Sequence, residues 1–344
     1  MIATGPRILI VRLSAIGDVL HGLPVLSALR AKWPAAHLSW VVEGRAAELL
    51  AGHPALDELI VVPRGWLKSP RAVFELRRRL AAVQPKVALD LQGLTKSAIV
   101  AWLSGAPRRI GFAPPDGREL SGLIATEQVA ARSAHVVDRY LELLAPLGVD
   151  RPEARFELPS FSDAQAAVDR WLRELALGGS FAAINPGAGW PSKVWPAERY
   201  AAVARHLGAA RGLSSLVVWA GDVERQWAEQ IVAGSGGFAR LAPRTSLCEL
   251  AAVCRRSCLF VGSDTGPLHL AAAVDTPCVG LFGPMPGERN GPYGRQHIIV
   301  QKVCLQGSSR MRRTANNDSM LAIAVGDVCT ACDTLLARRA SWAA

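Results

Sequence analysis

Asp18 is the first residue whose type and position suit catalysis. It lies in the stretch RLSAIGDVLHGLP, residues 12–24, directly after the apolar run ILIV. A carboxylate at the end of a buried strand suits a general base, which takes a proton from an attacking hydroxyl. The structural alternative is a helix N-cap, a position that Asp fills often, because an apolar helical pattern follows. The stretch by itself leaves both interpretations open.

A second stretch, VGSDTGPLHLAAAV, has features that suit a bound phosphate. Asp264, Thr265 and Gly266 stand between an apolar strand and a helical pattern. The free backbone amides and the positive dipole end of a helix N-terminus bind anions, and Gly266 permits a close approach. The alternative is an ordinary capped helix, in which Asp264 or Thr265 is the cap and His269 is a packed residue.

A third stretch, NPGAGWPSKVWP, follows another apolar strand and combines flexible glycines, among them Gly189, with one cation, Lys193. Such a loop can hold a diphosphate, and the alternative is an exposed lysine on a turn. Two familiar phosphate signatures are absent: no GxGxxG follows the first strand, and no GxxxxGK[ST] occurs anywhere. This argues against an ordinary nicotinamide dehydrogenase and against a P-loop enzyme.

The elements that must position these loops alternate along the chain. In the first half RILIV, LSWVV, ELIVV and KVALDLQG each precede an amphipathic helical pattern, and the rhythm restarts at SFAAINPGAG. Nearly continuous apolar strands with helices between them predict parallel sheets covered on both faces. The chain is therefore predicted to be α/β, with two doubly wound Rossmann-like domains. Ligands of such sheets bind at the carboxyl ends of the strands, so we expect the active site in a cleft between the domains.

The polar stretch VDRPEARFELPSFSDA has little periodicity and predicts the domain boundary near residue 155. The predicted domains are residues 1–155 and 156–317. Residues 318–344 contain an apolar helical pattern, and we expect this last helix to pack back on the first domain.

The composition limits which binding partners and which cellular compartment are expected. The 344 residues carry 39 Lys and Arg against 29 Asp and Glu, a net charge of +10 that favours anionic partners. No apolar run reaches the roughly 20 residues of a spanning helix, and MIATGPRILIV contains no secretory signal, so a cytoplasmic location is expected. The seven cysteines lack the spacing of a disulfide framework, and CTAC at 329–332 is too weak a signal to predict a metal site.

In combination these stretches resemble the ADP-heptose heptosyltransferases of lipopolysaccharide core assembly, glycosyltransferase family 9. RLSAIGDVLHGLPVL is similar to the opening motif of that family and DTGPLHLAAA to its donor-site motif; PSKVWPAERY, DLQGLTKSA and WVVEGRA also match in kind and order. The resemblance runs from about residue 7 to 335. It implies a GT-B fold with the acceptor on the N-terminal domain, the nucleotide sugar on the C-terminal domain, and inversion at the anomeric carbon without a metal or other cofactor.

The resemblance also implies roles for individual residues. Asp18 would be the general base, Lys193 and the amides at Thr265 and Gly266 would stabilise the departing diphosphate, and Glu224 would accept hydrogen bonds from the ribose. The donor-binding set is Gly17, Gly189, Lys193, Glu224, Asp264, Thr265, Gly266 and His269. The acceptor carries phosphates and carboxylates, and its expected ligands are Arg64, Lys96, Arg109 and Arg118.

The first half is most similar to the heptosyltransferase I branch, which adds L-glycero-D-manno-heptose from ADP-heptose to the Kdo sugar of the lipid-linked inner core. The alternatives are heptosyltransferase II, a family member with another donor or acceptor, or a GT-B sugar-nucleotide epimerase. Many members carry a loop with Cys and His before the last helix, where this chain reads CLQGSSRMRRTANND. The acceptor would place the protein at the inner face of the cytoplasmic membrane. The segment ELRRRL either forms a solvated helix face or rests on anionic lipid headgroups. The sequence contains no nucleic-acid-binding signature.

Overall fold

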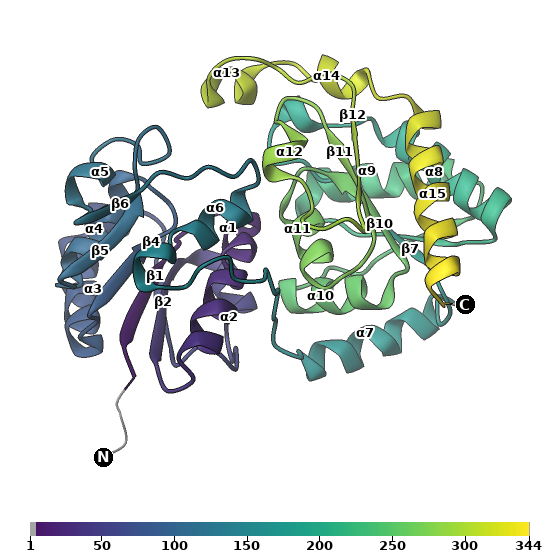
Figure 1. Cartoon of the computed structure of the whole chain (residues 1–344). Coiled ribbons are helices and arrows are strands. Elements are labelled where there is room, and N and C mark those ends of the chain that lie inside the picture. The colour runs from purple at the N-terminus through teal and green to yellow at the C-terminus, as the bar shows by residue number, and fades with distance from the viewer. Residues whose placement is uncertain (1–4, 344) are drawn as a thin grey trace. The chain divides into compact units, whose positions relative to one another are not determined.

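Each half of the chain builds a six-stranded parallel sheet with helices on both faces. The structure is a computed structural model that describes residues 5–343, and its contacts divide the chain between Pro159 and Ser160. Figure 1 shows the two units, each with its own sheet. The prediction of two doubly wound α/β domains is confirmed, and the division falls close to the predicted boundary near residue 155.

The first unit has the strand order β3-β2-β1-β4-β5-β6. Helices α3, α4 and α5 cover one face of this sheet, and α1, α2 and α6 lie on the other (Figure 1). Its strands are β1 (Arg7–Val11), β2 (His37–Glu43), β3 (Glu58–Val62), β4 (Val87–Asp90), β5 (Arg108–Phe112) and β6 (Glu127–Val129). Its helices are α1 (Ile16–His21), α2 (Leu23–Lys32), α3 (Pro70–Val83), α4 (Thr95–Leu103), α5 (Ser121–Ile124) and α6 (Val136–Glu142).

The second unit repeats the same winding, with the strand order β12-β11-β10-β7-β8-β9. Its strands are β7 (Ala182–Asn185), β8 (Ser215–Val217), β9 (Ala239–Leu241), β10 (Leu259–Ser263), β11 (Cys278–Phe282) and β12 (Ile298–Gln301). Its helices are α7 (Ser162–Glu174), α8 (Ala197–Arg211), α9 (Gly221–Gly234), α10 (Leu247–Arg256), α11 (Gly266–Ala273), α12 (Gly287–Asn290), α13 (Ser309–Thr314), α14 (Asp318–Leu321) and α15 (Val325–Ala343).

The central strands are buried on both sides, as parallel strands between two helix layers must be. Every residue of β4, β7, β10 and β11 is buried. The helices between them carry one apolar face each, and several begin at a clear signal: the Ser69 hydroxyl accepts from the Ala72 amide and Pro70 opens α3. The loops after the strands are thereby held on a rigid frame.

The last helix corrects one expectation. The sequence predicts that it packs on the first domain, but α15 packs on α8 and on strands β10–β12 of the second unit. Its apolar residues Val328, Cys332 and Leu335 belong to the core of that unit, and Asp333 pairs with Arg211 of α8 at 2.7 Å. The apolar stripe therefore completes the second core.

Candidate functional site

The two central strands of the first sheet, β1 and β4, mark its topological switch point. The chain turns from β1 toward β2 and from β4 toward β5, and doubly wound sheets bind their ligands at the carboxyl edge of such a point. Asp18 follows β1 at this edge. The loops that follow β1 and β4 are joined there, since the Leu13 amide donates to Oε1 of Gln92 at 2.9 Å.

Asp18 is not the N-cap of its helix. Ala15 holds the N-cap position, and Asp18 is the third residue of α1, with its Oδ2 accepting from the Ala15 amide at 3.1 Å. The same oxygen lies 2.6 Å from Nη2 of Arg12, and the Asp18 side chain is 34% exposed. The carboxylate is thus held from the protein side and accessible from solvent, which suits a base that meets its substrate at the surface. Gly17, the residue before it, is buried in the first turn of α1.

Arg12 is the residue of this edge that the sequence prediction missed. Its side chain is 8% exposed, lies over the Tyr140 ring at 5.5 Å and donates through Nη1 to the Leu91 carbonyl at 3.3 Å. Burial lowers the pKa of Arg12, but Asp18, Tyr140 and Asp90 together raise it more, so the net pKa lies above the ordinary value. A permanent cation therefore fixes the direction of the Asp18 carboxylate. The available signal was a charged residue immediately after an apolar strand.

Three of the four predicted acceptor ligands lie at the same edge as Asp18. Lys96 Nζ is 3.0 Å from Oε2 of Glu43 and 3.3 Å from the Ser14 hydroxyl, in the loop that leads to Asp18. Arg64 is exposed and follows β3, close to Gly44, and Arg118 is exposed in a loop whose backbone is bonded to Gly93 after β4.

Arg109 is separate from this group. It lies near the amino end of β5, and its guanidinium donates to the carbonyls of Ile124 and Ala106, both at 2.9 Å. The amino ends of parallel strands are at the opposite edge of the sheet from the Asp18 loop. These bonds give Arg109 a structural role, which the residue type and the nearby motif did not reveal.

The second sheet has its switch point between β7 and β10, and the two predicted phosphate loops follow these two strands. Lys193 and Asp264 meet there: Nζ of Lys193 lies 2.6 Å from Oδ2 of Asp264 and 3.2 Å from its carbonyl oxygen. The other carboxylate oxygen of Asp264 lies 3.2 Å from Nε2 of His269. The three side chains are 11%, 8% and 6% exposed, so Lys193 is a buried ion-pair partner and not an exposed turn lysine.

The ion pairs fix the charge state of this cluster. Burial raises the pKa of Asp264, but His269 and Lys193 lower it more, so the net pKa lies below the ordinary value. Thr265 occupies the N-cap position of α11 and Gly266 opens the helix, while the Thr265 hydroxyl donates to the Ser263 carbonyl at 3.2 Å. Hence the half-buried amide end of α11 lies beside a cluster that already holds a negative and a positive charge.

Trp190 adds an aromatic wall that the sequence prediction did not include. Lys193 Nζ lies 4.2 Å from its ring centre, and the Arg313 guanidinium lies 5.0 Å from the same centre. Arg313 belongs to α13, in the segment SSRMRR where the chain departs from the pattern of the family it resembles. The departure therefore brings a second cation to the loop after β7. Gly189, in the same loop, has open space where a side chain would start.

Glu224 lies in the first turn of α9 and reaches back toward the loop after β7. Its Oε2 accepts from the Ala220 amide at 2.8 Å, and a Cβ on Gly187 would lie 2.6 Å from its Oε1. Burial raises the pKa of Glu224 above its ordinary value, and the Ala220 amide offsets this in part. The absence of a side chain at Gly187 is what allows the carboxylate to lie beside the NPGAG loop.

The raised pKa of Glu224 yields a testable prediction. A raised folded-state pKa contributes stability that is present at low pH and lost as the pH rises through it. The Glu224→Gln variant should therefore be at least as thermostable as the parent at pH 7 without ligand, with the difference disappearing toward pH 4. If Glu224 accepts hydrogen bonds from a ribose, the same variant should bind ADP about tenfold more weakly. Thermal unfolding and calorimetric titration measure both effects.

Glu229→Gln is the matched control, since Glu229 lies on the same helix, is half exposed and pairs with Arg225. It should change neither the pH dependence nor the affinity for ADP. A destabilised Glu224→Gln variant at pH 7 would contradict the burial argument.

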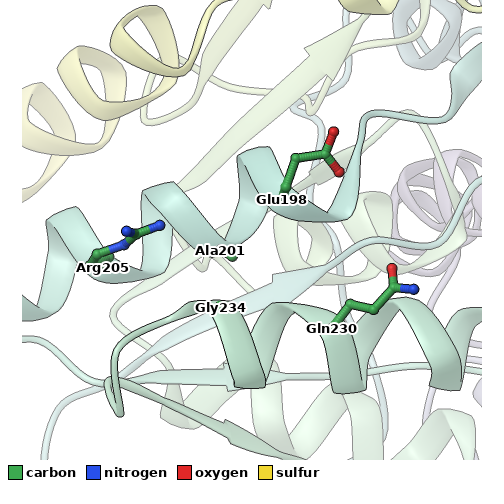
Figure 2. A pocket seen from close by; sticks show the side chains of 5 residues that line it. All are labelled: Glu198, Ala201, Arg205, Gln230 and Gly234. Atoms are coloured by element: carbon green, nitrogen blue, oxygen red, sulfur yellow. The ribbon is translucent and has the colours of Figure 1, made fainter.

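Two other features are not part of the candidate site. Figure 2 shows a depression between α8 and α9, lined by Glu198, Ala201, Arg205, Gln230 and Gly234, none of which is a predicted site residue.

The second feature is the CTAC segment, where burial raises the pKa of Cys329 and Cys332. Among residues 5–343, no three His, Cys, Asp or Glu side chains gather as a metal site would require. Within the same residues, no helix is both long and apolar enough to cross a membrane.

Comparison with known proteins identifies relatives over most of the chain. The family described as glycosyltransferase family 9 (heptosyltransferase) matches residues 73–320. A lipopolysaccharide heptosyltransferase 1 of Pseudomonas aeruginosa is 33% identical over 310 residues, which cover 85% of this chain and 82% of the relative.

Two solved structures extend the likeness to the fold. A glycosyl transferase family 9 protein from Veillonella parvula has a TM-score of 0.83 at 24% identity and covers 98% of this chain and 99% of its own. The E. coli heptosyltransferase WaaC with ADP-2-deoxy-2-fluoro heptose has a TM-score of 0.74 at 25% identity and covers 95% of this chain and 99% of its own.

Proposed function

Because the chain belongs to glycosyltransferase family 9, we propose that it transfers L-glycero-D-manno-heptose from ADP-heptose to the Kdo sugar of the lipopolysaccharide inner core, with inversion at the anomeric carbon. The observation that carries this proposal is the placement of the site motifs. Asp18 lies at the switch point of the first sheet, and Lys193 with Asp264 lies at that of the second. Membership in a transferase family argues against the epimerase alternative.

Asp18 is the proposed general base. The acceptor hydroxyl attacks the anomeric carbon, and its proton passes to the free Oδ1 of Asp18 as the glycosidic bond forms. Oδ2 is held by Arg12 and by the Ala15 amide. Positive charge builds on the sugar in an oxocarbenium-like transition state, and a carboxylate close to it is favourable. The ion pair with Arg12 fixes the direction of the carboxylate.

The departing ADP is the proposed ligand of the second unit. As its diphosphate gains charge, the amides of Thr265 and Gly266 at the start of α11 and the cations on Trp190 stabilise it. Lys193 is already paired with Asp264, so its share of this charge is limited, and Arg313 supplies the second cation. Glu224 would accept from the ribose hydroxyls. We propose that these groups carry the leaving-group charge without a metal ion.

The acceptor is proposed to lie at the carboxyl edge of the first sheet. Arg64, Lys96 and Arg118 converge on that edge and suit the phosphates and carboxylates of a lipid-linked Kdo acceptor. Arg109 is left out of this set because its guanidinium is committed to backbone carbonyls. Such an acceptor would place the enzyme at the inner face of the cytoplasmic membrane.

A product assay tests the proposal. The protein is incubated with Kdo-lipid A and one of ADP-heptose, ADP-glucose or UDP-N-acetylglucosamine, and the products are read by mass spectrometry with the anomeric configuration assigned by NMR. We expect transfer from ADP-heptose only, with opposite configuration in donor and product, and unchanged in EDTA. A preference for another donor, or for an acceptor that already carries heptose, would contradict the proposed substrates.

A further inference from the structure

Residues 63–86 concentrate most of the net charge of the protein. They contain seven cations, Arg64, Lys68, Arg71, Arg77, Arg78, Arg79 and Lys86, against the single acid Glu75, a net +6 from 24 residues in a chain whose total is +10. The proposed transfer reaction uses only Arg64 of these. The remaining charge has no counterpart in the site described above.

Helix α3 displays this charge on one outward face. Its apolar residues Leu76, Leu80 and Val83 are buried in the core under the sheet, and Arg71, Arg77 and Arg78 are exposed on the other side. Within residues 5–343 none of these three arginines pairs with a carboxylate. Three cations on one helix face, against the single exposed acid Glu75, create a local positive potential.

Large apolar side chains interrupt this charged surface. Phe74 lies on α3 between Arg71 and Arg78 and is 71% exposed, and Leu67, one turn before the helix, is 43% exposed. Trp102 of α4 is 61% exposed, and α4 covers the same face of the sheet as α3, because Val100 and Leu80 share one core (Figure 1). An apolar side chain of this size in water is unfavourable unless a partner covers it.

We propose that the outward face of α3 together with the turn before it, defined by Leu67, Lys68, Arg71, Phe74, Arg77 and Arg78, binds the surface of a bilayer that contains anionic lipid. The arginines and Lys68 attract the negative headgroups, and Phe74 and Leu67 enter the boundary between headgroups and acyl chains. Cations interspersed with one aromatic and one aliphatic side chain on an amphipathic helix are the usual composition of an interfacial helix.

The position of the helix links this surface to the proposed reaction, on which this part of the inference rests. Helix α3 follows β3, so its first turns, with Arg71 and Phe74, lie at the carboxyl edge of the first sheet. Asp18, Arg64 and Lys96 lie at that edge. A bilayer on α3 would therefore present a lipid-linked acceptor to the edge that holds the proposed base.

Flotation with vesicles tests the surface without substrates. Vesicles of phosphatidylcholine with 30% phosphatidylglycerol are compared with pure phosphatidylcholine, and neither contains donor or acceptor. The parent should bind the anionic vesicles, and 0.5 M NaCl should release it. The triple variant Arg71→Gln, Arg77→Gln, Arg78→Gln should lower the partition coefficient about a hundredfold, and Phe74→Ala about tenfold.

The matched control is the triple variant Arg170→Gln, Arg173→Gln, Arg244→Gln, which removes the same charge from exposed positions of the second unit. It should bind vesicles as the parent does, and circular dichroism checks that all variants are folded. Equal binding of parent and α3 variant, or binding to neutral vesicles as tight as to anionic ones, would overturn the proposal. The proposal would also be overturned if the α3 variant lost binding to single-stranded RNA while its binding to vesicles was unchanged.

Activity separates this inference from the proposed function. The α3 variant should transfer heptose to a short, water-soluble Kdo acceptor at the parental rate and to vesicle-embedded Kdo-lipid A at least tenfold more slowly. Vesicle binding by a protein that transfers no heptose would contradict the proposed function and leave the docking surface intact. Equal rates of the α3 variant and the parent on the embedded acceptor would overturn its role in presenting the acceptor.

Discussion

Asp18→Asn is expected to lower the turnover number by about 100- to 10,000-fold, the range that a positioned general base contributes. The amide has the shape of the carboxylate and can still accept from Arg12 and from the Ala15 amide, so the local fold should persist. It cannot take up a proton at neutral pH. Affinity for ADP, measured by calorimetry, should be unchanged, because the variant alters only the first unit. The turnover number comes from single-turnover assays with saturating donor.

Asp163→Asn is the control for Asp18→Asn, because Asp163 is an exposed first-turn carboxylate of another helix, α7. It should leave turnover unchanged, which separates loss of a base from loss of a favourable helix-dipole charge.

Arg12→Met tests whether Arg12 positions Asp18: loss of a charge-assisted hydrogen bond of about 1.5–3 kcal/mol should lower turnover about 10- to 100-fold. Arg12→Lys should restore part of the turnover that Arg12→Met loses. Parental turnover in Asp18→Asn would remove Asp18 from the mechanism.

Lys193→Met is expected to have the largest effect on stability. It leaves the Asp264 carboxylate buried with His269 alone, and breaking a buried ion pair from one side costs about 3–5 kcal/mol. The depressed pKa of Asp264 adds a pH dependence: its stabilisation is present above the ordinary carboxylate pKa and is lost as the pH falls through the folded-state value. Urea unfolding at several pH values should show a smaller acid-induced loss in the variant than in the parent.

The double variant Lys193→Met, Asp264→Asn separates stability from donor binding. Removing both charges should recover much of the lost stability, because no uncompensated charge remains buried. It should not recover the full affinity for ADP, because Lys193, one of the two cations over Trp190, is still missing. Recovery of both would show that Lys193 acts only as a structural partner of Asp264. An unfolding free energy of Lys193→Met equal to that of the parent would contradict the buried pair.

The positions of Asp18, Lys193 and Asp264 at carboxyl edges were predictable because each follows a strand that is mostly apolar. Such strands occur in parallel sheets, and a chain that alternates strand and helix always places the post-strand loop at the carboxyl edge. Arg109 shows the limit of the rule. It lies at the beginning of β5 and not after its end, so the same topology places it at the other edge.

Side-chain partners far apart in the chain could not be predicted. Lys193 was assigned to the diphosphate as a free cation, but its position beside β10 gives it Asp264, 71 residues away, as a partner. Trp190 and Arg313 are 123 residues apart and meet only because α13 packs by the Lys193 loop. The last helix was assigned to the wrong domain, since an apolar stripe indicates that a helix is covered but not which core covers it.

The sequence by itself determined that the chain forms two doubly wound sheets, which loops follow their central strands, and which family the protein resembles. These properties depend on local periodicity and on motifs that are contiguous in the chain. Only the tertiary structure decided that Asp18 is the third residue of α1 and is held by Arg12, that Lys193 is paired, and that an unpaired basic face lies on α3. Each of these depends on distances through space and on burial, which different packings of the same elements would change.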